Sequence, residues 1–559
     1  MSLSHYISDL SVRAFLARWW QFAAAVASGL LMVLAFEPFN YTLLAWVALA
    51  PLLYALSGEI GWKRALVCGW LAGVTFFFFS TNWITHSMIQ FGGMAKPLAY
   101  GASFLFSAVV AIFPGLFALV MARLVRASGY RALLLAPFVW VATEWLRGII
   151  TGATWNALGI SQVDRISIAL WAKVGGVWLV SGFVTLPGAI LAAWKRRTDS
   201  VRKFIFQLLP VAVAALLLWW FFPPFLLVED PIHVARQIRP DIDVAAVQPD
   251  IPLSIYESPG EASEYFERTL KLTRGTISQA GNQKTDLIVW AESPLTLNYE
   301  HDEAVRARLN DLVQQTGDNL IFSAIARDGD HYFNSAQTIA PPSGSQPVRQ
   351  LRRYDKIRLV PFGEYVPFRF ALGCFVPPMV GDFTPGREAA VNTLRLKTQH
   401  AILQNEETDW QPGLERTTNF ARTGTFICYE AAYPNLVRQF VRNGATLLIN
   451  ISNDAWFGNT AGARQHLAHA RMRAIENDRD LVRVTNSGIS ALITADGRVA
   501  DELPTFTPAA KVWQAHLNSR ETFYTRYGDW FPLVCTLISL IAPALSLVRP
   551  RSSPVRGNS

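Results

Sequence analysis

The sequence predicts a multi-pass membrane helix bundle joined to an α/β domain, and three observations lead to this fold class. Of the 559 residues, 51% are hydrophobic and only 16% are charged, which is unusual for a water-soluble chain. Long apolar runs gather at both ends of the chain. Between them, short apolar runs alternate with amphipathic stretches, as strands and helices do in an α/β domain.

The net charge of +8 is unevenly distributed. Residues 1–228 contain 16 Lys and Arg against 6 Asp and Glu, and residues 531–559 contain three Arg and no acid. The segment 229–530 is therefore mildly acidic, which argues against a nucleic-acid partner. The four cysteines form no CxxC or Cys/His cluster, so neither a disulfide-dense scaffold nor a structural zinc site is expected.

Eight apolar runs approach the length of about 20 residues that a membrane-spanning helix needs. They are roughly Trp19–Phe36, Tyr41–Ser57, Ala65–Ser80, Leu98–Met121, Ala132–Trp145, Ile168–Trp194, Phe204–Leu227 and Phe531–Val548. A cleaved signal peptide is disfavoured, because the second run follows the first after only Glu37–Asn40. We expect seven helices in residues 1–228, a separate α/β domain in 229–530, and an eighth helix with a tail in 531–559.

The distribution of Lys and Arg predicts the orientation in the membrane. With a cytoplasmic N-terminus, fifteen of these residues fall in the cytoplasmic ends and short loops, and only Lys96, Arg147 and Arg165 fall in the opposite short loops. Both termini are then cytoplasmic, and 229–530 lies outside the cytoplasm.

The central segment changes character near Val228. Its apolar runs have strand length, at Val244–Val247, Leu287–Trp290, Leu320–Ala324, Thr425–Cys428, Leu447–Ile451, Leu481–Val484 and Ile489–Ile493. Amphipathic helices are predicted at Ala262–Gln279, Asp302–Thr316 and Ala463–Asp478, and surface excursions at Pro341–Gln346 and Thr398–Thr418. This alternation is typical of an α/β domain with a buried sheet.

Three predicted strand ends carry reactive side chains. Glu292 follows Leu287–Trp290, Lys356 and Glu364 flank an apolar turn, and Cys428 ends Thr425–Cys428. Catalytic groups gather where strands give way to loops. A cysteine nucleophile needs a base or a cationic neighbour, and a lysine ammonium can stabilise an oxyanion. The pattern therefore favours covalent acyl transfer with Glu292, Lys356 and Cys428 as base, stabiliser and nucleophile.

The motifs around these residues resemble the nitrilase (carbon–nitrogen hydrolase) superfamily with its Glu-Lys-Cys triad. The sequences are Trp-Ala-Glu292-Ser-Pro, Tyr-Asp-Lys356 with Val-Pro-Phe-Gly-Glu364, Ile-Cys428-Tyr-Glu430, and Ser452-Asn-Asp-Ala-Trp-Phe-Gly458. More narrowly, the chain resembles the bacterial apolipoprotein N-acyltransferase family over nearly its whole length. Its membrane part is similar to that family in Thr81-Asn-Trp-Ile, Phe91-Gly-Gly-Met94 and Glu144-Trp-Leu-Arg147-Gly.

The resemblance implies a nitrilase-like αββα sandwich set on a bundle of about eight transmembrane helices in the bacterial inner membrane, with the catalytic domain periplasmic. It implies that Cys428 takes an acyl chain from a phospholipid such as phosphatidylethanolamine, forming a thioester. The acceptor would be the N-terminal amine of diacylglyceryl-cysteine in an apolipoprotein. Glu292 would act as base and then acid, Lys356 would hold the oxyanion, and no metal or cofactor is implied.

Four further residues gain supporting roles by the same resemblance. Glu364 would position Lys356 or the incoming amine, Tyr429 and Glu430 would shape the site, and Trp456 would line the site or belong to the core. The chain departs from the family after Gln248-Pro-Asp-Ile-Pro252, where Tyr256-Glu257 stands in place of the usual basic-aromatic pair. Tyr256 is a candidate substitute for that aromatic residue.

Other interpretations remain open at this stage. The chain could be a membrane-anchored nitrilase-like amidase acting on a small amide, or a non-catalytic assembly factor.

A Cys374–Cys428 disulfide would block the nucleophile, and Cys68 and Cys535 are expected to be buried. His466 and His469 lie three apart on a predicted helix, where a packing role is favoured over a metal site. Glu144 and Arg147 lie near a membrane end, as functional groups or as a structural ion pair.

Overall fold

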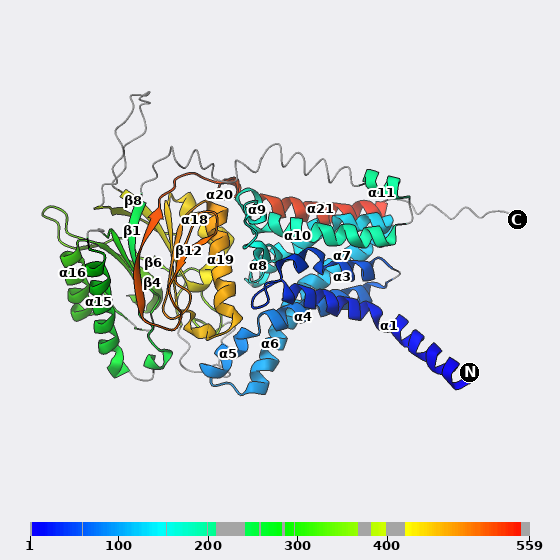
Figure 1. Cartoon of the computed structure of the whole chain (residues 1–559), viewed down its shortest axis with the longest axis horizontal. Coiled ribbons are helices and arrows are strands. Elements are labelled where there is room, and N and C mark those ends of the chain that lie inside the picture. Colours follow the sequence, from blue (N-terminus) through cyan, green and yellow to red (C-terminus); the bar gives the residue numbers. More distant parts are fainter. Residues whose placement is uncertain are drawn as a thin grey trace, which may run out of the picture. The chain divides into compact units, whose positions relative to one another are not determined.

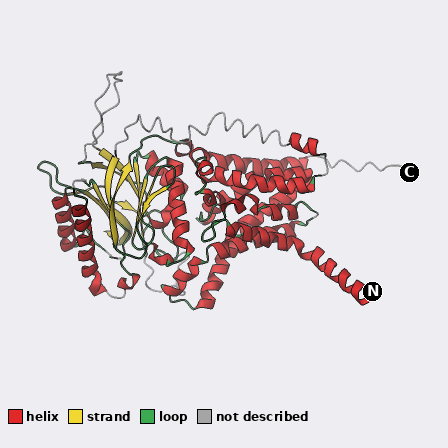
Figure 2. Ribbon diagram, viewed as in Figure 1, coloured by secondary structure: helices red, strands yellow, loops and turns green. Residues whose placement is uncertain are grey.

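The computed structural model describes residues 3–58, 60–152, 154–197, 200–207, 241–256, 259–281, 285–293, 295, 297–366, 382–397 and 420–548. The chain divides into two compact units. The first, called the helical unit here, comprises residues 1–162, 177–222 and 529–559, and the second, the sandwich unit, comprises 163–176 and 223–528. Figure 2 shows that helices make up the helical unit, whereas all described strands belong to the sandwich unit.

The helical unit consists mainly of apolar helices. They are α1 (Leu3–Leu34), α2 (Ala45–Ala48), α3 (Ala50–Leu56), α4 (Trp62–Ser80), α5 (Trp83–Gln90), α6 (Lys96–Val110), α7 (Ile112–Ser128), α8 (Ala136–Thr151), α11 (Val201–Gln207), α21 (Trp530–Val548) and the greater part of α10 (Ala172–Arg196), with 3₁₀ turns η1 (Thr42–Leu44), η2 (Gly129–Leu135) and η3 (Leu158–Gln162). Helix α4 packs against α1 and α7, and α21 packs against α7 and α8.

Three helical stretches of the described chain are long and apolar enough to cross a membrane: Trp62–Ser80, the nearly continuous run Lys96–Thr151, and Ala172–Arg196. Shorter apolar helices cover Trp19–Leu34, Thr42–Leu56 and Trp530–Ala544. The expected run Phe204–Leu227 lies mostly outside the described residues. Large side chains that a water-soluble protein would bury are exposed here, including Leu105 and Leu540 at 65% each.

The sandwich unit contains two β-sheets. One has the order β13-β1-β2-β3-β4-β5, with β6 also paired to β4, and the other has the order β12-β11-β10-β9-β8-β7. The strands are β1 (Asp241–Gln248), β2 (Leu287–Trp290), β3 (Asn319–Asp328), β4 (His331–Ala340), β5 (Arg349–Gln350), β6 (Tyr354–Asp355), β7 (Val391–Arg395), β8 (Phe420–Ile427), β9 (Leu447–Ser452), β10 (Leu481–Thr485), β11 (Ala491–Ile493), β12 (Val499–Glu502) and β13 (Ala509–His516).

The two sheets face each other and helices cover both outer faces, which gives an αββα sandwich (Figure 1). Helices α15 (Ala262–Gln279) and α16 (Glu303–Thr316) pack on the first sheet, and α18 (Pro434–Arg442) and α19 (Ala461–Asn477) pack on the second. Strand β1 contacts β10, and β4 contacts β8, across the interface between the sheets.

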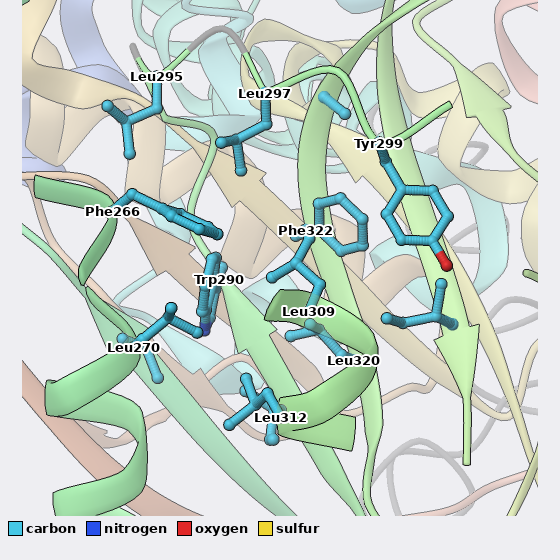
Figure 3. Close-up of a cluster of buried hydrophobic side chains, with 14 of the residues drawn as sticks. Phe266, Leu270, Trp290, Leu295, Leu297, Tyr299, Leu309, Leu312, Leu320 and Phe322 are labelled. Carbon is cyan, nitrogen blue, oxygen red and sulfur yellow. The ribbon is translucent and has the colours of Figure 1, made fainter. Parts of the chain in front are cut away.

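A hydrophobic cluster fixes α15 and α16 on the first sheet. Figure 3 shows Phe266 of α15 beside Trp290 of β2, with Leu309 and Leu312 of α16 in the same cluster. The rings of Phe266 and Trp290 meet edge to face with centroids 6.1 Å apart. Because Trp290 is the last residue of β2, this packing fixes the end of the strand that precedes Glu292.

Parallel pairing brings the reactive positions to common sheet edges. Strand β2 pairs in parallel with β1 and β3, and β9 pairs in parallel with β8 and β10. The carboxyl ends of parallel strands lie at the same edge of a sheet. Glu292 therefore leaves the first sheet at the edge where parallel strands end, and Cys428 and Asn453 do the same in the second.

A short segment that precedes Val177 in the chain also belongs to the sandwich unit. Residues 163–176 contain helix α9 (Ile166–Ala169) and the first residues of α10, which kinks at Gly175 and Gly176. Gly176 has φ +66°, and a Cβ there would lie 2.6 Å from the ring of Tyr524 in helix α20 (Phe523–Tyr527). Only glycine fits this close approach at a positive φ.

Candidate active site

The structure brings together the three residues predicted to carry the chemistry. Glu292 lies two residues after β2, Lys356 directly follows β6, and Cys428 follows β8 as the first residue of the 3₁₀ turn η7 (Cys428–Ala432). The observed strand β8 thus ends at Ile427, one residue before the predicted end. Lys356 is 1% exposed and Cys428 is 8% exposed.

Lys356 lies between two carboxylates. Its Nζ is 2.8 Å from Oε1 of Glu364 and 3.5 Å from Oε1 of Glu292. The side-chain amide of Asn334, on β4, donates to both of these oxygens, at 2.7 Å to Glu364 and 2.9 Å to Glu292. The main-chain carbonyl of Asn334 also accepts from the N–H of Lys356 at 2.8 Å. Asn334 therefore fixes the relative positions of all three groups.

Main-chain donors hold the second oxygen of each carboxylate. The N–H of Asn453, just after β9, donates to Oε2 of Glu292 at 3.0 Å, and the N–H of Val360 donates to Oε2 of Glu364 at 2.8 Å. Glu292 thus links the first sheet to the end of a strand in the second. With both oxygens engaged, the Glu292 carboxylate has a fixed orientation.

The charges of this cluster couple its members. Burial alone would lower the pKa of Lys356, but the negative charges of Glu292 and Glu364 outweigh burial and raise it, so Lys356 remains an ammonium group. Burial, followed by the negative charge of Glu292, raises the pKa of the Cys428 thiol to about 12, although the ammonium of Lys356 opposes the rise. Cys428 therefore rests as a neutral thiol and needs a base to become a nucleophile.

The backbone of Cys428 is strained. Its φ is +51°, in the left-handed region that residues with a side chain rarely occupy. Such conformations cost about 1–3 kcal/mol and persist where the surroundings enforce them, often at active sites. The turn starts directly after the buried strand β8, so the thiol stands at the tip of a sharp bend between strand and 3₁₀ turn.

The side chain of Glu430 connects two segments of the site through hydrogen bonds. Its side chain is fully buried and accepts hydrogen bonds from the Tyr354 hydroxyl (2.7 Å) and from the main-chain N–H groups of Ile357 (2.8 Å), Arg358 (3.0 Å) and Ile427 (2.8 Å). These donors come from the segment after β6 and from the end of β8. Glu430 thus ties the loop that carries Lys356 to the turn that carries Cys428.

The remaining candidates lie around the triad or beyond the described residues. Tyr429 follows the nucleophile and packs edge to face on Tyr433, with centroids 5.3 Å apart. Trp456, in turn η8 (Asp454–Phe457), is 38% exposed, whereas Phe457 is buried. Tyr256 ends the turn η4 (Leu253–Tyr256). Cys374, Glu257 and the insertion 398–418 lie outside the described residues, and Cys428 is a free thiol.

Glu144 and Arg147 hold a loop of the helical unit. Both are buried on α8. Oε1 of Glu144 accepts from the N–H of Leu158 at 2.7 Å, and Arg147 donates to the carbonyl of Trp155 at 2.9 Å. These contacts give the two residues a structural role in the segment after α8.

Two sets of residues at the site were not predicted to be functional from the sequence. Asn334 lies within a strand of mixed polarity, where an asparagine gives no signal of a catalytic environment. Asp454, His466 and Arg483 form a buried network behind Cys428, with Nε2 of His466 2.9 Å from the Cys428 carbonyl. The sequence motif included Asp454, and His466 was expected to have a packing role.

Known protein families match both parts of the chain. The apolipoprotein N-acyltransferase N-terminal domain matches residues 28–190, and the carbon-nitrogen hydrolase family matches residues 243–523. A Geobacter metallireducens apolipoprotein N-acyltransferase is 30% identical over 94% of this chain and 95% of its own length. One from Photobacterium profundum is 30% identical over 95% of this chain and 96% of its own.

Among solved structures, Saccharomyces cerevisiae Nit3, a member of branch 10 of the nitrilase superfamily, is similar to 52% of this chain and 96% of its own, with 16% identity and a TM-score of 0.36. The sequence relatives span both the helical and the sandwich unit. With a family model over half of its residues and relatives aligned almost end to end, the chain belongs to the apolipoprotein N-acyltransferase family.

Proposed function

We propose that this protein transfers a fatty acyl chain from a phospholipid to the N-terminal amine of diacylglyceryl-cysteine in an apolipoprotein, through a thioester on Cys428. Its family supports this activity. The single observation that carries the proposal is the position of Lys356 between Glu292 and Glu364, with the Cys428 thiol close enough for these charges to act on it. This cluster supports Glu292 as the base, Lys356 as the oxyanion stabiliser and Cys428 as the nucleophile.

The first half-reaction forms the acyl-enzyme. Glu292 takes the proton from Sγ of Cys428 as the sulfur attacks the ester carbonyl of the phospholipid, and the Lys356 ammonium stabilises the resulting oxyanion. The tetrahedral intermediate collapses and breaks the ester C–O bond. Glu292 returns its proton to the leaving oxygen, so lysophospholipid departs and a thioester remains on Cys428.

The second half-reaction transfers the acyl group. The neutral amine of the apolipoprotein attacks the thioester carbonyl, again with Lys356 facing the oxyanion, and Glu292 accepts a proton from the nitrogen. Collapse breaks the C–S bond, and the proton held by Glu292 restores the thiol. The products are an amide and free enzyme. Each half-reaction balances without an added cofactor, which is the basis of a ping-pong scheme.

The protein is a bacterial membrane protein, as its family and its apolar helices indicate. We further propose eight spanning helices in the inner membrane, with both termini in the cytoplasm and the sandwich unit in the periplasm. The excess of Lys and Arg in one set of short loops supports this orientation. A phospholipid donor of the phosphatidylethanolamine type would be available in that membrane.

Mass spectrometry of the purified protein tests the thioester. After incubation with phosphatidylethanolamine vesicles, we expect a fatty-acyl mass on the peptide that contains Cys428, and its loss on treatment with hydroxylamine. Cys428→Ser should abolish the hydroxylamine-sensitive adduct. Cys535→Ser, which removes another buried cysteine, is the matched control and should keep it. An absent adduct together with ammonia release from small amides would favour an amidase instead.

Complementation tests the complete reaction in cells. In a strain depleted of its own apolipoprotein N-acyltransferase, the parent gene should restore triacylated lipoprotein, whereas Glu292→Ala, Lys356→Ala and Cys428→Ala should not. Membrane levels of each variant, measured by immunoblot, separate loss of chemistry from loss of protein. Full restoration by all three variants would overturn the proposed mechanism.

A further inference from the structure

A buried polar network lies behind the nucleophile and has no role in the mechanism above. It consists of Asp454 in η8, His466 in α19 and Arg483 in β10, each no more than 1% exposed. Nη2 of Arg483 lies 2.7 Å from Oδ2 and 3.0 Å from Oδ1 of Asp454, and 3.0 Å from Nδ1 of His466. The network reaches the active site through Nε2 of His466, which is 2.9 Å from the carbonyl oxygen of Cys428.

The hydrogen bonds determine which nitrogen of His466 carries the proton. A carbonyl oxygen can only accept, so Nε2 is protonated and donates to Cys428. Burial and then the Arg483 guanidinium lower the pKa of His466, so the ring is neutral near pH 7. Its Nδ1 then has a lone pair that accepts from Nη2 of Arg483, and the same Nη2 donates to Oδ1 of Asp454, which lies 3.0 Å from Nδ1. The imidazole acts as a donor of fixed direction rather than as a base for the thiol.

We infer that His466 is a positioning residue for the nucleophile: by holding the main-chain carbonyl of Cys428, it keeps the strained turn in place and directs Sγ toward Glu292 and Lys356. This inference rests on the proposed function for its catalytic meaning. The carbonyl of Cys428 belongs to the peptide that must rotate if φ of +51° relaxes to a common value. A directional bond from a buried ring opposes that rotation.

The surroundings hold the ring of His466 in one orientation. The edge-to-face contact with Phe457 places the ring centroids 5.5 Å apart. Asp454, which fixes Arg483, is itself held by the Ser452 hydroxyl at 2.8 Å. A Cβ on Gly488 would lie 2.3 Å from Cβ of Asp454, so only glycine at position 488 leaves room for this carboxylate.

The two sides of the turn are held by different groups. Glu430 accepts from the N–H of Ile427, just before the nucleophile, at 2.8 Å. His466 donates to the carbonyl of Cys428 on the other side. The peptide unit that precedes the Cα of Ile427 and the peptide unit that follows the Cα of Cys428 are therefore both anchored by buried side chains. Removal of either anchor frees one peptide unit, and the thiol then samples directions away from Glu292.

Two substitutions of His466 separate positioning from packing. His466→Gln keeps an amide N–H near the place of Nε2, whereas His466→Leu keeps apolar bulk but has no donor. We expect Leu to lower the rate of acyl-enzyme formation about 100-fold, the cost of a displacement of about 1 Å at a reacting atom, without a change in KM for phospholipid. Gln should restore most of this rate. A merely structural role predicts equal losses in the two variants.

His469 offers a matched control. It is also buried, three residues further along α19, and its substitution by Leu perturbs the same helix. We expect His469→Leu to acylate Cys428 at the parental rate per folded molecule. Thermal unfolding of each variant in the same detergent gives the folded fraction used for this comparison. Equal acylation by His466→Leu and the parent would overturn the inference.

Alkylation of Cys428 by iodoacetamide tests the positioning role of His466 independently of the proposed function. If the parent forms no acyl adduct, the proposed function fails, but the direction of Sγ still sets the pKa of the thiol, which burial and the charge of Glu292 raise. A thiol that turns away from Glu292 has a lower pKa, so we then expect His466→Leu to be alkylated at least about tenfold faster at pH 7 than the parent and His466→Gln, since one pKa unit changes the thiolate fraction about tenfold. Identical alkylation rates in all three proteins would overturn the positioning role, whatever the natural substrate is.

Discussion

Nζ of Lys356 lies 2.8 Å from Oε1 of Glu364, closer than its distance of 3.5 Å to Glu292. The predicted base is therefore not the carboxylate nearest to the lysine. Glu364 and Glu292 both offset the charge of the ammonium, and under the proposed mechanism the Glu292 carboxylate exchanges protons with Cys428. The main-chain N–H of Val360, in the turn between Lys356 and Glu364, donates a hydrogen bond to the Glu364 carboxylate and stabilises this turn.

Glu364→Gln should lower kcat about 100-fold, since a neutral amide no longer fixes the ammonium at the oxyanion position. Acyl-enzyme formation followed by rapid quench and mass spectrometry measures this rate. Glu300→Gln is the control, because Glu300 pairs with Arg353 at 3.0 Å outside the triad. An unchanged rate in Glu364→Gln would show that Glu292 alone positions the lysine.

Asn334→Ala should lower kcat about 10- to 100-fold, because it removes one amide that bonds to two carboxylates, and hydrogen bonds to charged groups contribute about 1.5–3 kcal/mol each. KM for phospholipid should change little. Asn392→Ala is the matched control. Asn392 is buried and donates to Thr338 and to the Arg352 carbonyl. Equal losses in both variants would point to general destabilisation.

Periodicity and motifs predicted the main elements of the sandwich. The helix expected at Ala262–Gln279 is α15 with the same bounds, and the strand expected at Leu287–Trp290 is β2. These segments have a clear helical period or an unbroken apolar run, because each packs on the core through one face or is buried throughout. Strand-end reasoning then indicated the places of Glu292, Lys356 and Cys428.

Other elements gave no comparable signal. Strand β4 (His331–Ala340) was not predicted, since its first half is polar and partly exposed. Its pairing with β3 over nine residues is a tertiary contact that local periodicity does not reveal. For the same reason the bridging role of Asn334, which lies on β4, and the contact between His466 and Cys428 could not be predicted, because each joins segments far apart in the chain.

The raised pKa of Cys428, about 12, predicts how its reactivity depends on pH. Only the thiolate reacts with iodoacetamide, so the rate at Cys428 should rise about tenfold per pH unit from pH 7 to pH 10. A free cysteine, with its pKa of about 8.5, should instead reach a plateau. Peptide-level mass spectrometry separates Cys428 from the other cysteines. A plateau at Cys428 below pH 9 would contradict the resting neutral thiol.

Lys173 of α10 forms a buried ion pair with Asp478, the residue after α19, and both belong to the sandwich unit. Asp478 also accepts from Asn518 at 2.8 Å. Lys173→Met leaves this buried carboxylate without its cation, which should cost about 3–5 kcal/mol of stability. Thermal unfolding in detergent measures the loss. The double variant Lys173→Met with Asp478→Asn should recover part of it.

The same pair predicts a dependence of stability on pH. Burial alone would raise the pKa of Asp478. The charge of Lys173 and the hydrogen bonds that Asp478 accepts outweigh burial and lower this pKa below its usual value. A lowered pKa in the folded state means that the contribution to stability is complete above the unfolded pKa of about 3.9 and is lost as the pH falls through the folded pKa. Between pH 7 and pH 3 the parent should therefore lose more stability than the double variant. Parallel curves for the two proteins would show that the pair contributes nothing.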